Sequence, residues 1–160
     1  MRKLVAYFSA TGVTDTVARR LAKAAGADLY EIKPVVPYTP ADLNWLDEKA
    51  RSTVEMHDKK IRPEILTGDV RMENYGVVYL GFPIWWYVAP TLMNTFLEAY
   101  DFSGKTIVLF ATSGGSDFGS TLAELQPSAP GAHFVQGRLL NGSVSDKSLR
   151  EIAALGTLSH

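Results

Sequence analysis

A buried strand that runs into a hydroxyl-rich loop and then a helix limits the folds open to this chain more than any other feature. Residues 4–8 form a continuous apolar run, Leu-Val-Ala-Tyr-Phe, as expected of a strand that is buried on both faces. Residues 9–14 form the polar loop, and residues 16–25 place their apolar side chains on one face of a helix. A strand, a polar loop and a helix start in this order predict a binding site for an anion.

The composition of the loop indicates which anion it accepts. The first N–H groups of a helix have no partner within the helix, and the helix dipole adds positive charge there. Ser9, Thr11 and Thr14 supply hydroxyl donors, and Gly12 permits a tight turn close to a ligand. The loop has no Lys or Arg and matches neither the G-x-x-x-x-G-K-S/T nor the G-x-G-x-x-G motif. We therefore expect a phosphomonoester; the alternative is a helix that is merely capped by Thr11 or Thr14.

Composition excludes several other classes of function. A chain of 160 residues, 46% hydrophobic and 21% charged, suggests one domain over residues 1–160. The net charge of −1 gives no reason to expect nucleic acid or an anionic membrane as partner. There is no cysteine, and hence no thiolate chemistry or disulfide. The sequence begins without a signal-peptide pattern and has no apolar run of about 20 residues, so we expect a cytoplasmic protein without membrane insertion.

Strand and helix patterns alternate along the chain, which predicts an α/β fold with a parallel sheet covered on both faces. The expected strands are 4–8, 28–32, 77–80, 106–111 and 133–140. The expected helices are 16–25, 41–56, 90–100, one that follows residue 119 and ends at about 125, and 146–155. Three unusual loops, 9–14, 81–87 and 112–119, follow the three most apolar strands. Because ligands of such sheets bind at the carboxyl ends of the strands, we expect these loops to meet at one site.

The second and third loops suit a planar ring. Trp85, Trp86 and Tyr87 are adjacent and cannot all point into one core, so at least one is expected at the surface as a flat apolar wall. Alternatively, two of them cover a sheet edge or a subunit contact. The loop 112–119 is rich in glycine and serine, and its backbone can approach the heteroatoms of a ring, with Phe118 closing over it; the alternative is a mobile surface turn. A phosphomonoester joined to such a ring describes FMN.

These motifs resemble the flavodoxin family. Residues 9–14 match its phosphate loop, S/T-x-T-G-x-T, and residues 81–90, G-x-P-x-W-W-x-x-A-P, are similar to a bacterial flavodoxin-like branch. The loop 112–119 and the segment from 38–43 to 62–63 also look like that branch. The resemblance spans nearly the whole chain. It implies the short-chain form: a three-layer sandwich around a five-stranded parallel sheet in the order 2-1-3-4-5.

The resemblance also implies a set of residues that contact FMN. The phosphate is assigned to the first loop, namely Ser9, Ala10, Thr11, Gly12, Val13 and Thr14. The isoalloxazine ring is assigned to Pro83, Ile84, Trp85 and Trp86. Its polar edge is assigned to Thr112, Ser113, Gly114, Gly115, Ser116 and Gly119. No catalytic side chain and no metal ligand are expected.

Three classes of function remain open at this point. The first is an FMN-dependent electron carrier with redox protein partners, as a monomer or a weak homodimer. The second is an FMN-dependent oxidoreductase that takes hydride from NAD(P)H and reduces a quinone or a nitro group. The third, a response-regulator-like signalling domain, needs clustered acidic residues after the first strand, where this chain has hydroxyls. The near-neutral charge differs from the strongly acidic surface typical of flavodoxin carriers.

Overall fold

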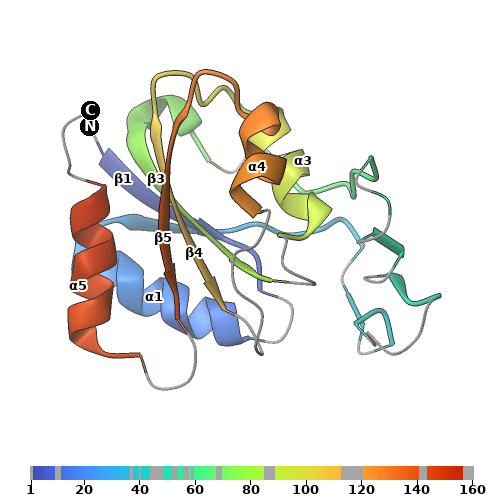
Figure 1. Ribbon diagram of the computed structural model, residues 1–160, viewed down its shortest axis with the longest axis horizontal. Helices are drawn as coiled ribbons and strands as arrows, with labels where there is room; N and C mark the ends of the chain where they lie inside the picture. The colour runs from blue at the N-terminus through green and yellow to red at the C-terminus, as the bar shows by residue number, and fades with distance from the viewer. Residues whose placement is uncertain are drawn as a thin grey trace.

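The computed structural model shows an α/β sandwich built around one sheet (Figure 1). It describes residues 2–9, 12–36, 38–39, 41–43, 49–51, 54–55, 58, 60–67, 70–84, 89–112, 121–140 and 144–156. The strands are β1 (Arg2–Tyr7), β2 (Asp28–Glu31), β3 (Tyr75–Pro83), β4 (Thr106–Thr112) and β5 (His133–Leu139). The α-helices are α1 (Val13–Ala25), α3 (Thr91–Ala99), α4 (Thr121–Leu125) and α5 (Asp146–Leu155), with 3-10 turns η1 (Met72–Asn74) and η2 (Gln126–Ser128).

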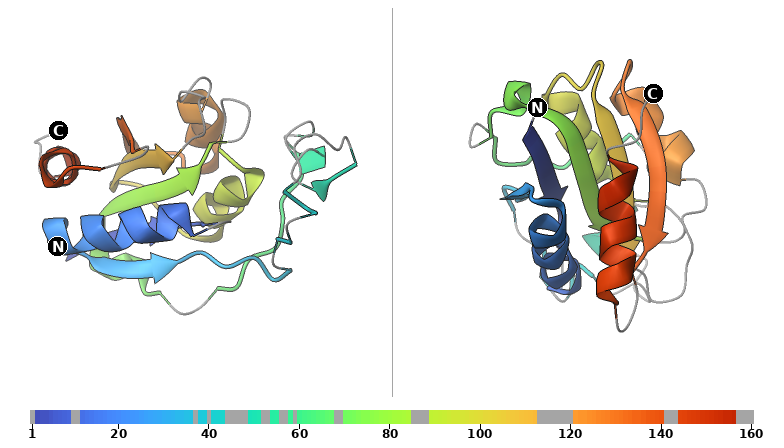
Figure 2. Two further views of the ribbon diagram at one scale, coloured as in Figure 1. Left: turned by 90° about the horizontal axis from the view of Figure 1, so that it is seen from below. Right: turned by 90° about the vertical axis from the view of Figure 1, so that its left-hand side faces the viewer.

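The sheet has the predicted order, β2-β1-β3-β4-β5, and every neighbouring pair is parallel. Leu4 lies beside Val78, and Val78 lies beside Ile107, so the three central strands share one register across the middle of the sheet. Helices α1 and α5 cover one face, and α3 and α4 cover the other (Figures 1 and 2). The predicted fold class is therefore confirmed.

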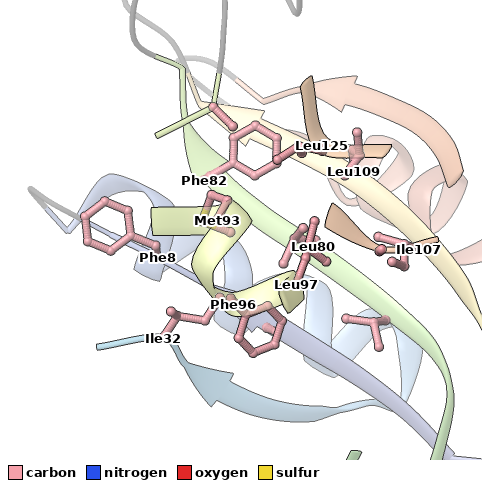
Figure 3. Close-up of a cluster of buried hydrophobic side chains, with 14 of the residues drawn as sticks. Phe8, Ile32, Leu80, Phe82, Met93, Phe96, Leu97, Ile107, Leu109 and Leu125 are labelled. Carbon is pink, nitrogen blue, oxygen red and sulfur yellow. The ribbon is translucent and has the colours of Figure 1, made fainter. Parts of the chain in front are cut away.

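Each face of the sheet has its own hydrophobic core, because side chains alternate along a strand. In β1, Leu4 and Ala6 point toward α3 and α4, whereas Val5 and Tyr7 point toward α1 and α5. Figure 3 shows the first of these clusters, in which Phe96 and other α3 side chains pack on the central strands. Burial on both faces is the physical reason why the central strands are continuous apolar runs rather than alternating ones.

The largest differences from the predicted boundaries are in α1 and β3, and the other boundaries of the named elements differ by at most two residues. Helix α1 begins at Val13, three residues earlier than expected, because Gly12 takes the position that precedes the helix. Strand β3 extends over Tyr75–Pro83, beyond the predicted 77–80, because its flanking residues pair with β1 and β4. The predicted helix 41–56 lies partly outside the described residues; within them, the Val54 N–H donates to the Ala50 carbonyl at 3.0 Å, as in a helix.

The long connection between β2 and β3 folds back on itself and reaches beyond the carboxyl ends of the strands (Figure 2, left). Pro34 forms an antiparallel bridge with Ile65, and the Val35 N–H donates to the Glu64 carbonyl at 2.9 Å. Arg62 then binds Glu98 of α3, with Nε 2.9 Å from Oε1. The connection is thus held at its base by backbone pairing and against α3 by an ion pair.

Candidate functional site

The ends of β1, β3 and β4 lie next to one another at one edge of the sheet. Tyr7 lies beside Gly81, and Pro83 lies beside Thr112. The pairing continues past the strands, because the Phe8 N–H donates to the Gly81 carbonyl at 3.0 Å. The Ile84 N–H likewise donates to the Thr112 carbonyl at 2.9 Å. The three unusual loops therefore begin side by side, and their predicted meeting at one site stays a prediction, since most of the second and third loops lies outside the described residues.

Gly12 shapes the first loop and the start of α1. Its φ of 94° lies in the left-handed region, which a residue with a Cβ adopts at a cost. Its N–H donates to Ser9 Oγ at 3.0 Å, and its carbonyl accepts from the N–H of Thr16 at 3.2 Å. Within the described residues, no side chain caps the first turn of α1. The amides at this helix start thus lie at the sheet edge where the loops meet, in the arrangement that suits an anion.

Thr14 takes a different role from the one that the capping alternative assigned to it. Its side chain is buried, and its Oγ1 lies 2.9 Å from Oγ1 of Thr112. Gly12, not Thr14, precedes the helix, so the alternative in which Thr14 is the N-cap is wrong. The hydroxyl pair joins the first turn of α1 to the end of β4. Contact between Thr14 and a phosphate stays a prediction.

The predicted site residues divide into two groups. Ser9, Gly12, Val13, Thr14, Pro83, Ile84 and Thr112 are described, and all of them lie at the carboxyl edge. The other predicted contacts lie outside the described residues: Ala10, Thr11, Trp85, Trp86, Ser113, Gly114, Gly115, Ser116 and Gly119, as well as Tyr87 and Phe118. In the described group, Val13 is 55% exposed at the helix start, whereas Ile84 is buried in the core.

A network beside the first loop was not predicted from the sequence. The Tyr7 hydroxyl donates to Oδ1 of Asp15, and Arg19 Nε donates to Oδ2 of Asp15 at 3.0 Å. The hydrogen bond from Arg19, and then that from Tyr7, holds the pKa of Asp15 below its ordinary value. Burial, together with the bond to Asp15, raises the pKa of Tyr7. Only the i,i+4 spacing of Asp15 and Arg19 signals this network in the sequence.

A second group places the β2–β3 connection beside the site. The ring of Tyr38 lies 5.5 Å from that of Phe8, the residue after β1, and the Arg51 guanidinium lies 3.9 Å above the Tyr38 ring. Glu55 is 5% exposed, accepts from the Tyr38 hydroxyl, and accepts from Arg51 Nε at 3.0 Å. Burial and the bond to Glu55 raise the pKa of Tyr38. The connection therefore packs against the strand that leads into the first loop.

The described part of the chain holds no group of three or more His, Cys, Asp or Glu side chains arranged to bind a metal ion. Nor does any helix in the described ranges have the length and apolar composition that crossing a membrane requires. Of the three histidines, His133 is described and lies exposed at the start of β5, away from the carboxyl edge.

A parallel sheet in the order 2-1-3-4-5, with the start of a helix beside the β1–β3 switch point, defines a flavodoxin-like α/β protein. The sequence model of the Flavodoxin family matches residues 2–154. The chain belongs to the flavodoxin family. Among curated proteins, no match was found.

Solved structures agree with this assignment. A protein assigned as a flavoprotein from Bacteroides uniformis is 47% identical, with a TM-score of 0.87, covering 93% of this chain and 95% of its own. Another, from Bacteroides eggerthii, is 45% identical, with a TM-score of 0.90 and coverage of 99% of both chains. A flavoprotein from Lactobacillus acidophilus in complex with FMN shares the fold at 21% identity, with a TM-score of 0.67 and coverage of 86% and 92%.

Proposed function

We propose that this protein binds FMN at the carboxyl edge of the sheet and serves as an electron carrier. The observation that carries the proposal is the start of α1, which no described side chain caps, with Gly12 at φ 94°, next to the ends of β3 and β4. Membership of the flavodoxin family supports it, as does the FMN complex of the Lactobacillus acidophilus flavoprotein, which has the same fold.

The donors in the first loop fit a phosphomonoester. Ser9 Oγ accepts the N–H of Gly12, which leaves the serine hydroxyl proton to donate to a phosphate oxygen. The amides of Gly12 and the following helical residues belong to the positive end of α1. Neutral donors of this kind fit a phosphate that carries one or two charges, without a metal ion to balance it. In this proposal the phosphate contacts are those of residues 9–14.

The flavin ring would lie between the other two loops. Pro83, Ile84, Trp85 and Trp86 are proposed to line one side, and residues 112–116 with Gly119 the polar edge. The bound FMN would supply the redox chemistry, and the protein's residues would bind it, orient it and limit the access of water. The role requires no acid or base among the side chains. We further propose redox proteins as partners, a cytoplasmic location, and a monomer or weak homodimer.

The visible spectrum of the purified protein, taken before and after anaerobic addition of NADPH, tests this function. We expect flavin absorption that stays oxidised with NADPH, since a carrier depends on a separate reductase. Prompt bleaching would show that the protein is itself a NAD(P)H oxidoreductase, and a quinone or nitro compound would then be tested as the acceptor. A colourless protein that FMN does not reconstitute would overturn the proposal.

A further inference from the structure

One carboxylate in the first turn of α1 is held from two sides. The Tyr7 hydroxyl, from the buried face of β1, donates to Oδ1 of Asp15, and Arg19 Nε donates to Oδ2 at 3.0 Å. The Tyr7 side chain is buried, the Asp15 side chain is 30% exposed, and that of Arg19 is 63% exposed. Both carboxylate oxygens are therefore fixed in place, one by a neutral donor and one by a cation that faces the solvent.

The position of Asp15 brings its charge into conflict with a phosphate. Asp15 is the third residue after Gly12, so it lies in the turn whose amides are proposed to bind the phosphate. An acidic side chain in the first turn favours the helix, because it interacts with the positive end of the helix dipole. A phosphate at the same helix start uses the same positive end and is repelled by the Asp15 charge.

Arg19, the partner of Asp15, shares a depression with charged side chains of both signs. Arg19 and Lys33 carry one positive charge each, and Asp15 and Glu31 carry one negative charge each, which gives a sum of zero. Arg19, Glu31 and Lys33, together with Tyr7, line one depression of about 350 Å³ beside β2. The compensation of Asp15 depends on Arg19, the cation that contacts it.

We propose that Asp15 is a specificity-determining residue. Its negative charge lowers the preference of the site for a phosphorylated flavin over an unphosphorylated one. Arg19 compensates this charge and Tyr7 orients the carboxylate, so that together they limit the effect. Arg19 and Tyr7 act as positioning residues, through Asp15 rather than by contact with the ligand. This inference rests on the proposed function, because it concerns the FMN phosphate. Riboflavin has the same ring system without the phosphate and is therefore the ligand for comparison.

The experiment measures the dissociation constants of FMN and riboflavin for the apoprotein, by quenching of flavin fluorescence, at low ionic strength. Asp15→Asn is expected to lower the dissociation constant of FMN about five- to tenfold, since it removes one charge that repels the phosphate. Arg19→Gln is expected to raise the dissociation constant of FMN by a similar factor, since it leaves the Asp15 charge uncompensated. Riboflavin affinity is expected to change less than about twofold in both variants, because it has no charge for Asp15 to act on.

Arg20→Gln is the matched control. It removes the same charge from the next residue of α1, but Arg20 pairs with Asp146 of α5, with Nη2 3.0 Å from Oδ1. We expect its ratio of FMN to riboflavin affinity to stay close to that of the unaltered protein. Retained riboflavin binding shows that each variant is folded.

Each result decides the inference. If both flavins bind and Asp15→Asn and Arg19→Gln leave the affinity ratio unchanged, the role of Asp15 is refuted while the FMN site stands. If Arg20→Gln moves the ratio as far as Arg19→Gln, the effect belongs to the overall charge of α1, and the inference fails. If the unaltered protein binds neither flavin, the proposed function and this inference fall together. The inference is supported if the ratio of FMN to riboflavin affinity rises in Asp15→Asn, falls in Arg19→Gln and stays close to that of the unaltered protein in Arg20→Gln.

Discussion

At the scale of single residues, two glycines mark the ends of α1 in the same backbone conformation. Gly12 precedes the helix with φ 94°, and Gly26 follows it with φ 63°. A Cβ added to either would meet no described atom within 4 Å, so the main cost of a substitution is the strain of the left-handed conformation. The two positions lie at opposite ends of the helix. Gly12 lies at the candidate site, and Gly26 lies at the far end of the helix.

We predict that Gly12→Ala and Gly26→Ala each lower the free energy of unfolding by about 1–2 kcal/mol, the typical cost of a left-handed backbone with a Cβ. Only Gly12→Ala should also weaken FMN binding, because only Gly12 belongs to the loop proposed to hold the phosphate. Urea unfolding and FMN titration of both variants check this. Equal loss of FMN affinity in the two variants would contradict the placement of the phosphate.

At the scale of elements, the hydroxyl pair between Thr14 and Thr112 joins α1 to β4 across 98 positions of the sequence. Both side chains are buried, and among the described residues each hydroxyl has the other as its hydrogen-bond partner. The pair fixes where α1 begins relative to the strand end from which the third loop departs. The geometry of the site thus depends on a contact between two layers of the fold.

A double-mutant cycle of Thr14→Val and Thr112→Val tests this contact. Each single change is expected to lower the free energy of unfolding by about 1–3 kcal/mol, because it leaves one buried hydroxyl unpaired. The double variant should lose less than the sum of the two, since it removes both polar groups together. Thermal or urea unfolding of the four proteins supplies the measurement. Strictly additive losses would show that the two hydroxyls do not act as a pair.

Gly137 of β5 has no room for a side chain against β4. A Cβ on Gly137 would lie 2.2 Å from the Leu109 carbonyl oxygen, at the point where the register between the strands shifts. We predict that Gly137→Ala lowers the free energy of unfolding by about 1–3 kcal/mol, the range for an overpacked site. Gln136→Ala, at an exposed neighbour, should change it by less than about 0.5 kcal/mol. Similar unfolding midpoints for the two variants would contradict this account.

At the scale of the whole molecule, carboxylates tie the outer segments to the sandwich. Glu98 of α3 accepts from Arg62 Nε at 2.9 Å and from Ser128 Oγ at 2.7 Å, which links the β2–β3 connection, α3 and η2. The bond from Arg62 is the main cause that lowers the pKa of Glu98 from its ordinary value of 4.5. Asp15 has a lowered pKa for the same kind of reason.

These shifts predict the direction of acid sensitivity. A carboxyl group whose pKa is lower in the folded state stabilises the fold above its unfolded pKa, and this stabilisation is lost as the pH falls through the folded value. We therefore expect stability to decline as the pH falls below about 4.5. The decline should be smaller in Glu98→Gln, which lacks the titrating group. Urea midpoints across this pH range check both statements, and an unchanged pH dependence in the variant would count against Glu98.

Much of this molecule is predictable from its sequence because burial on both faces leaves a plain signal. The apolar runs identified three central strands. The rule that ligands bind at the carboxyl ends of strands then predicted that the loops after these strands form one site. The contacts of Tyr7 with Asp15 and of Tyr38 with Glu55 were missed, because side-chain pairing between different elements depends on packing that no local period encodes. The hydroxyl pair of Thr14 and Thr112 was missed for the same reason.

The position of β1 inside the sheet has a consequence for synthesis on the ribosome. The strand is made first, yet one of its neighbours, β3, begins at Tyr75, and the edge with the three loops also needs β4, which ends at Thr112. A nascent chain in which β3 has not yet been made can pair β1 only with the short strand β2. Its central strand keeps an open side until the later strands emerge. This apolar strand, most of which is buried in the finished fold, thus waits longest for its partners during translation, which makes premature release of the chain a hazard for aggregation.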